Sequence, residues 1–303
     1  RSFSSSIFQT SLSKRCRIPA QPGIHDPITS IEAHADPDII PYPYKEITRE
    51  LGFTCYMESL DKFAAFKAIL AYMHEFKVLL IRRPFRGFLI SDNRDFSPVL
   101  VKLNELGCPF LAAQLNAKGE ILEWHGLNKN TQNNNSELVS TCESYSRRLV
   151  ILWDLKRCRV PKGIPYDAVA GNIKSFLAGK GIDAPITIFN VYGDASKLPK
   201  SFIKACNKTG ISIIDEKDTD SVLKTILVDM VISSIDEPFK SQILLISGRG
   251  LRHFKPVLRS INLHTKCVLL AIPNLKKERP NILMDFGEFV WEWPAMAMGA
   301  ASA

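Results

Sequence analysis

The chain has 303 residues, of which 46% are hydrophobic and 23% charged, enough apolar material for a folded core and enough length for two ordinary domains. Its formal net charge of +8 favours an acidic partner such as nucleic acid. No apolar run approaches the roughly 20 residues of a bilayer-spanning helix, so we expect no membrane association. The seven cysteines include no CxxC pair, which argues against a structural zinc site and indicates a reducing compartment.

The first 46 residues lack the pattern of a folded domain. Residues 1–21 are rich in Ser, Lys and Arg and contain no acidic residue. This is the composition of a mitochondrial or plastid transit peptide, and a disordered terminus is an equally good interpretation. Residues 22–46 are proline-rich and are typical of a linker. We expect an organellar protein, with the cytoplasm or peroxisome as the alternative.

A first set of elements occupies residues 47–115. The pattern predicts, in order, strand 52–56, helix 62–75, strand 88–90, helix 98–106 and strand 109–113. Residues 116–147 include the polar run NKNTQNNNS, which cannot bury a core. We therefore predict a linker there.

A second, more regular set occupies residues 148–294, before a tail at 295–303. Strands and helical segments alternate at 149–154, 166–178, 186–192, 197–208, 211–214, 221–235, 243–246, 254–262 and 267–272. This alternation predicts an α/β fold with a mostly parallel sheet and helices on both faces.

An internal repeat links the two sets. The segment KAILAYM at 67–73 matches KTILVDM at 224–230, and residues 89–100 echo residues 245–258. Both pairs are separated by about 157 residues, and two copies of one fold are the simplest account. The first set has no counterpart of LVILWD, so we predict a degenerate tandem repeat whose first copy is partial.

Two carboxylates come directly after predicted strands. Asp154 follows the apolar run LVILW, and Asp194 follows the strand that ends at Gly193. Ligands of parallel sheets bind outside the carboxyl ends of the strands, so both residues are candidates for one shared site. The alternative is that each is a helix N-cap or a turn residue, positions that Asp favours.

A third candidate is Asp229, within the predicted helix 221–235 and among apolar residues. An acid in such surroundings is costly to bury unless it is paired or bound to metal, and the alternative is a solvated position at the helix edge. Three carboxylates that converge at strand ends would hold one or two Mg²⁺ or Mn²⁺ ions. Such ions activate water for attack on a phosphodiester.

A basic turn follows the first of these aspartates, with residues Lys156, Arg157, Arg159 and Lys162. These side chains can track a phosphate backbone, although a charged turn is usually just solvated. Their position beside Asp154 favours the RNA interpretation. The lysines of 197–208 have the same two interpretations, and there the solvent-facing one is favoured.

Several motifs of residues 148–294 occur together in one known family. They are VILWDLKRCRVPKG, VYGD, KTILVDM with SSIDEP, and ILLISG with HFKPVLRSINLHTKCVLLAIP. With them the chain resembles the NYN domain, the PIN-like ribonuclease fold of the limkain or meiosis-regulator-and-mRNA-stability-factor type. EFVWEWP is similar to plant relatives labelled as endonucleases or glycosyl hydrolases. Residues 52–114 resemble a partial second copy.

The resemblance implies a Rossmann-like, PIN-like sheet and metal-dependent cleavage of RNA. Mg²⁺ or Mn²⁺ would be held by Asp154, Asp194 and Asp229, which would form the catalytic acidic cluster. RNA would be the partner, with Arg249 and Arg252 joining the basic turn in contacting it. A homo-oligomer or a protein partner stays open.

Several positions depart from the family pattern. Leu223 stands where the family commonly carries an Asp, the triplet 247–249 reads Ser-Gly-Arg in place of Ser-Gly-Asp, and 252–254 reads Arg-His-Phe in place of Arg-Asp-Phe. A guanidinium in place of a metal-ligating carboxylate should weaken divalent-cation binding severely. The first copy has Tyr72 in place of the helix aspartate and Asn93 where the family places the Asp of its Ser-Gly-Asp.

Two hypotheses follow. One is a metal-dependent endoribonuclease with an eroded acidic site, acting through the three retained aspartates. The other is a catalytically inactive RNA-binding or protein-interaction module that keeps the nuclease fold.

Overall fold

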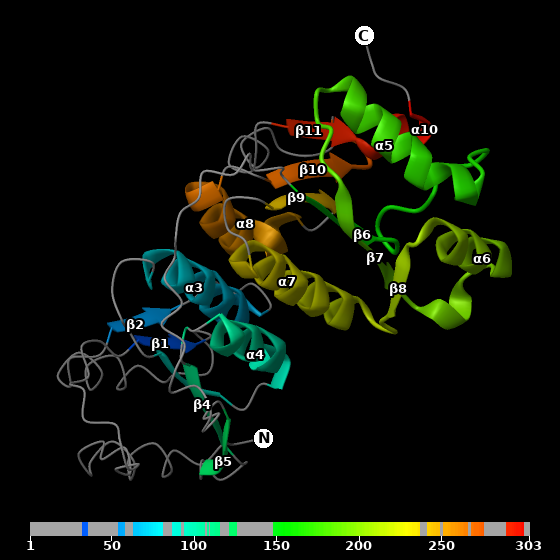
Figure 1. Ribbon diagram of the computed structural model, residues 1–303. Helices are drawn as coiled ribbons and strands as arrows, with labels where there is room; N and C mark the ends of the chain where they lie inside the picture. The colour runs from blue at the N-terminus through cyan, green and yellow to red at the C-terminus, as the bar shows by residue number, and fades with distance from the viewer. Residues whose placement is uncertain are drawn as a thin grey trace, which may run out of the picture.

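The computed structural model is shown in Figure 1. It describes residues 32–35, 54–57, 63–80, 87–91, 94–106, 108, 110–115, 121–125, 148–236, 241–248, 251–265, 268–275 and 289–299. We call the described residues up to 125 the N-terminal unit and those from 148 onward the C-terminal unit.

Six parallel strands form the sheet of the C-terminal unit (Figure 1). In spatial order they are β11 (Phe289–Glu292), β10 (Val268–Ile272), β9 (Ser241–Ile246), β6 (Arg148–Asp154), β7 (Ile186–Gly193) and β8 (Ser212–Asp215). Strands β9 and β10 are buried along their whole length, as is typical of parallel strands covered on both faces. The sheet confirms the predicted α/β fold.

The chain adds strands first to one side of β6 and then to the other, so the strand order reverses at the centre of the sheet. From β6 the chain adds β7 and β8 on one side, and it then returns to add β9, β10 and β11 on the other. Strands β6 and β9 are direct neighbours, with Trp153 opposite Ile246. The crevice outside the carboxyl ends of two such strands is where doubly wound sheets bind their ligands.

Helices cover both faces of this sheet. One face carries α5 (Val169–Gly179), α6 (Lys200–Thr209) and α10 (Trp293–Met298), with the short helices η2 (Tyr166–Ala168) and η3 (Ala195–Lys197). The other carries α7 (Thr219–Asp236) and α8 (Leu251–Thr265). Alternate residues of β6 serve the two cores, because Trp153 packs toward α5 and Leu152 toward α7.

The N-terminal unit contains two small sheets and two helices. In chain order its elements are β1 (Glu32–Ala35), β2 (Thr54–Met57), α3 (Ala64–Leu80), β3 (Gly87–Ile90), η1 (Arg94–Phe96), α4 (Ser97–Glu105), β4 (Phe110–Leu115) and β5 (Ile121–His125). The strands β1 and β2 pair in parallel, as do β3 and β4, whereas β5 is antiparallel to β4.

Two of these strands differ from the sequence predictions. The strand β1 lies in the segment predicted to be a proline-rich linker, and β5 lies in the predicted linker 116–147. Each is only four or five residues long and is completed by hydrogen bonds to a neighbouring strand. Local sequence carries little information about such pairing, because a short strand is stabilised mainly by its neighbours.

A four-helix layer joins the two units (Figure 1). Helix α3 packs against α8 and α7, and α4 packs against α7. Helix α7 is buried on most of its circumference because it lies between the sheet and the N-terminal helices. Among the helices that the structure describes, none has the length and apolarity to cross a bilayer.

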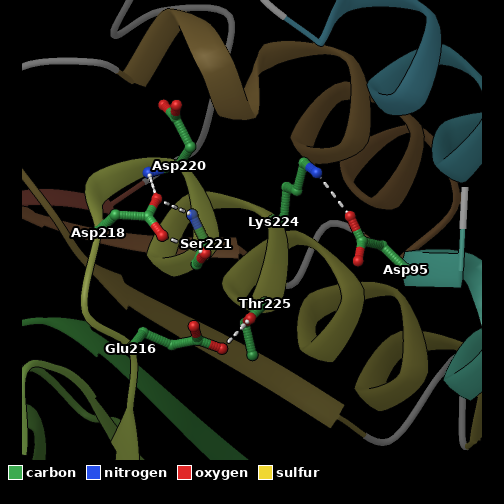
Figure 2. A network of polar contacts seen from close by, with 7 residues as sticks. All are labelled: Asp95, Glu216, Asp218, Asp220, Ser221, Lys224 and Thr225. Carbon is green, nitrogen blue, oxygen red and sulfur yellow. Dashed lines mark hydrogen bonds and ion pairs between the residues drawn. The ribbon is translucent and has the colours of Figure 1, made fainter.

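Polar contacts cross the same helix layer. The Nζ of Lys224 on α7 donates to Oδ2 of Asp95 at 2.6 Å (Figure 2). The same Nζ lies 4.8 Å from the ring centroid of Phe63. Deeper in the layer, the ring Nδ1 of His74 is 2.8 Å from the Oγ of Ser260, in a buried hydrogen bond between α3 and α8. These polar contacts act together with the apolar packing of the helices to hold the two units in one relative position.

We expect that loss of a core side chain from α3 destabilises both units together. Leu70 has no exposed surface and belongs to the same core as α7 and α8, so Leu70→Ala should lower the free energy of unfolding by about 2–5 kcal/mol. Urea denaturation followed by tryptophan fluorescence measures this, since Trp153 and Trp293 lie in the C-terminal core. Val101→Ala, at a position that is 58% exposed on α4, is the control. An unshifted fluorescence transition in Leu70→Ala would show independent units.

Candidate functional site at the carboxyl edge of the sheet

Asp154 lies at the end of β6, in the central crevice of the sheet, and has no exposed surface. Its Oδ2 accepts a hydrogen bond from Nη1 of Arg157 at 2.6 Å and one from the Oγ of Ser247, at the end of β9, at 3.2 Å. Its Oδ1 accepts the backbone N–H of Arg157 at 3.1 Å. Each carboxylate oxygen therefore accepts at least one hydrogen bond, and the charge is neutralised by a guanidinium three residues away.

Two tryptophan side chains hold the turn that carries Arg157 in place. Indole Nε1 of Trp153 donates to the carbonyl of Cys158 at 2.6 Å, and Nε1 of Trp293 donates to the carbonyl of Arg159 at 2.8 Å. The two indoles pack against each other with ring centroids 4.8 Å apart.

Burial raises the pKa of the Cys158 thiol, with the nearby Asp154 carboxylate adding to the shift, so this cysteine is a packing group.

The end of β9 closes tightly on this turn. A Cβ added to Gly248 would lie 3.0 Å from the carbonyl oxygen of Arg157 and 3.1 Å from Cγ of Pro273. Such contacts are closer than side chains normally tolerate, so the backbones of the two strand ends meet here because residue 248 is glycine. The chain is therefore closely packed at this point of the crevice.

Asp194 takes the role of a turn residue. It is the N-cap of η3, and its carboxylate accepts the backbone N–H and hydroxyl of Ser196 and a hydrogen bond from Nζ of Lys197. The hydrogen bond from Lys197, followed by those from Ser196, lowers the pKa of Asp194 to about 2. This is the capping alternative that the sequence left open.

Asp229 is half-buried in the middle of α7 and is paired with strand β7. Its Oδ2 accepts the hydroxyl of Tyr192 at 2.6 Å, and Nδ2 of Asn190 lies 3.5 Å away. Desolvation raises the pKa of Asp229, while the hydrogen bonds from Tyr192 and Asn190 oppose that shift. A tyrosine hydroxyl thus supplies the partner that this acid needs.

The three predicted carboxylates do not form a metal site in this arrangement. Each of them is engaged by a different set of partners, and two of those sets include a cationic side chain. Among the described residues, no three His, Cys, Asp or Glu side chains are grouped so as to hold a metal ion. Because Mg²⁺ and Mn²⁺ need several free oxygen ligands at about 2.0–2.2 Å, the donor set found here does not fit them.

Four of the predicted basic residues follow strand β6 at the same edge of the sheet. Lys156, Arg159 and Lys162 are exposed on the turn after β6, whereas Arg157 is mostly covered by its pairing with Asp154. Arg249 lies outside the described residues. Arg252 lies in α8, but its side chain is not among those described.

The start of α7 adds an acidic group at this edge that the sequence reasoning missed. Asp218 accepts the backbone N–H groups of Asp220 and Ser221, both at 2.8 Å, and so caps the helix (Figure 2). The hydrogen bonds from Ser221 lower its pKa, with a smaller contribution from the nearby charge of Lys156. The available signal was an Asp directly before the start of a helix, the usual N-cap position. The Tyr192–Asp229 pair had no signal, because it depends on how α7 packs across β7.

The segment that forms this edge of the sheet matches a known protein family. Residues 148–285 match the family model of the NYN domain. These residues form an NYN domain, with the PIN-like ribonuclease fold. No curated protein matches the chain.

NYN nucleases typically use divalent metals, and the domain implies RNA as the substrate class. The predicted family is therefore confirmed for residues 148–285, and so is the predicted parallel sheet. The family match does not by itself establish a metal site at that edge, because Arg157 already neutralises the charge of Asp154.

We expect Arg157 to be needed for the stability of the NYN domain. Removal of its guanidinium in Arg157→Met would leave a buried carboxylate without its cation, at a cost of about 2–4 kcal/mol once the partial exposure of Arg157 is allowed for. Urea denaturation measures the loss. Arg159→Met, an exposed position in the same turn, should change stability by less than about 0.5 kcal/mol. Equal effects of the two variants would contradict a buried ion pair.

We also expect Asp229 to make stability depend on pH. Because its pKa is raised in the folded state, its contribution to stability is full below about pH 4 and is lost as pH rises through the native pKa. Asp229→Asn should remove this loss while its amide oxygen still accepts the Tyr192 hydroxyl. Thermal unfolding at a series of pH values tests the prediction, with Asp183→Asn at an exposed loop position as the control. An unchanged pH profile in Asp229→Asn would contradict it.

Proposed function

We propose that this protein binds RNA at the carboxyl edge of its NYN domain without metal-dependent cleavage. The observation that carries the proposal is the ion pair of Asp154 with Arg157 in the central crevice. A carboxylate whose charge is already neutralised by an adjacent guanidinium is a poor ligand for a divalent cation, because the cation would have to displace or repel that guanidinium. The nuclease fold is kept, and its acidic residues support the local structure.

The charge of the same edge supports binding. Lys156, Arg159 and Lys162 are exposed after β6, and Lys197 and Lys200 are exposed after β7. In a parallel sheet, the segments after neighbouring strands lie at one edge, so these side chains border a common surface. A row of exposed cations of this kind neutralises phosphates and releases their counterions.

We also infer that the N-terminal unit is a degenerate, shortened copy of the same fold. Helix α3 corresponds to α7 through the matched segments 67–73 and 224–230, and the order α3–β3–α4–β4 parallels α7–β9–α8–β10. The strand pairs β3–β4 and β9–β10 are both parallel. The reciprocal packing of α3 on α8 and α4 on α7 is what two related units facing each other would produce.

RNA binding is expected to be dominated by salt-sensitive phosphate contacts. Lys156→Ala and Lys162→Ala should each weaken binding of a labelled single-stranded RNA and reduce the slope of log K against log salt by about 0.7. Fluorescence anisotropy across a salt series measures both effects. The matched control is Lys174→Ala, exposed on α5 away from the strand ends. Binding that is absent or independent of salt would contradict the proposal.

Incubation of the same RNA with Mg²⁺ or Mn²⁺ tests the absence of cleavage. We expect no metal-dependent products from the wild type or from Asp154→Asn. Metal-dependent cutting by the wild type that disappears in Asp154→Asn would overturn this part of the proposal and establish a nuclease.

A further inference from the structure

A hollow of about 620 Å³ lies along helix α6 and strand β8 and reaches the carboxyl edge of the sheet at Ala195. Strand β8 is the outermost strand of the sheet on this side. The walls include Ile203 and Asn207 from α6, Ser212 and Ile213 from β8, and Ala195 from η3. The hollow thus combines aliphatic surface with an exposed side-chain amide, and no part of the site described above uses it.

The walls of this hollow are fixed in advance. The backbone N–H of Ala195 donates to Oδ1 of Asp215 at 2.8 Å, which ties η3 to β8. The carboxylate of Asp194 caps η3 from within its own turn. At the far end of α6, Gly210 adopts a left-handed conformation with φ of 74° and turns the chain directly into β8. A pocket built this way needs little reorganisation to accept a ligand.

Lysines border the hollow on the exposed side of α6. At 100° per residue, Ile203, Asn207, Lys200 and Lys204 project within about 100° of one another, in that order around the helix. Both lysines are exposed, as is Lys197 on η3. A polyanion held by these cations would pass along the rim, with its uncharged groups within reach of the apolar walls.

We propose that this hollow receives one unpaired nucleobase of an RNA strand whose phosphates contact the lysines of α6. The inference rests on the proposed RNA-binding function and specifies its ligand as single-stranded RNA. The isoleucine side chains would contact the faces of the base, and the Asn207 amide, which both donates and accepts, would bind its polar edge. A duplex keeps those edges paired and cannot place a base there.

The test compares two oligonucleotides of about ten nucleotides with equal charge, one carrying bases and one abasic throughout. Binding of each to the full chain is measured by competition against a labelled RNA over a salt series. We expect the abasic strand to bind about tenfold more weakly with a similar salt dependence. Asn207→Ala should weaken binding of the base-bearing strand about threefold to tenfold and leave the abasic strand unaffected.

A second variant and a control distinguish the contribution of the hollow to binding from that of the charged side chains. Ile203→Ser, which removes an aliphatic wall, should act as Asn207→Ala does, whereas Lys208→Ala on the same helix should affect both strands equally. Asn207 is exposed, so its variant is not expected to disturb folding.

Equal binding of the two strands, or equal losses for both in Asn207→Ala, would overturn the base site and leave RNA binding through phosphates intact. Tighter binding of duplex RNA than of the single strand would also overturn it. Absence of salt-dependent binding to any RNA would overturn both this inference and the proposed function.

Discussion

A carboxylate with no exposed surface must be neutralised, and for Asp154 the neutralising group is the guanidinium of Arg157, three residues further along the chain. This ion pair lies at the point where the strand order reverses, and the surrounding structure is arranged about it. Ser247 from the neighbouring strand donates to the same carboxylate, and two indoles hold the turn through its carbonyl groups. The pair therefore determines both the conformation of the turn and the chemistry that its acid can perform.

A second constraint comes from the helix layer between the two units. Because α7 is covered by the sheet on one side and by α3 and α4 on the other, nearly its whole circumference is buried. Asp229 lies on this helix and finds its partner in Tyr192 of the adjacent strand. The N-terminal unit thus completes the core of the NYN domain, and the ion pair of Lys224 with Asp95 adds a polar contact between the two units.

The regular part of the fold was predictable from the sequence because periodicity reports burial directly. Strand β6 was evident as LVILW and helix α7 as KTILVDM, and the family followed from the same motifs. The short strands β1 and β5 were missed, since four or five residues gain their stability from pairing rather than from their own pattern. For the site, the sequence placed Asp154 and Asp194 correctly at strand ends but could not assign their partners. Whether a carboxylate faces a metal, a guanidinium or its own backbone depends on side-chain geometry.

The same edge of the sheet therefore presents an altered balance of charge. In the arrangement that the family resemblance implies, several carboxylates share one or two cations, and the metal mediates contact with the phosphodiester. Here Asp154, Asp194 and Asp218 are each bonded to groups of their own surroundings, including Lys197 for Asp194, while Lys156, Lys162 and Lys200 are exposed. An edge with its anions satisfied internally and its cations directed outward attracts phosphate without a bridging metal. The proposed loss of cutting and the proposed retention of RNA binding would both follow from this single arrangement of charge.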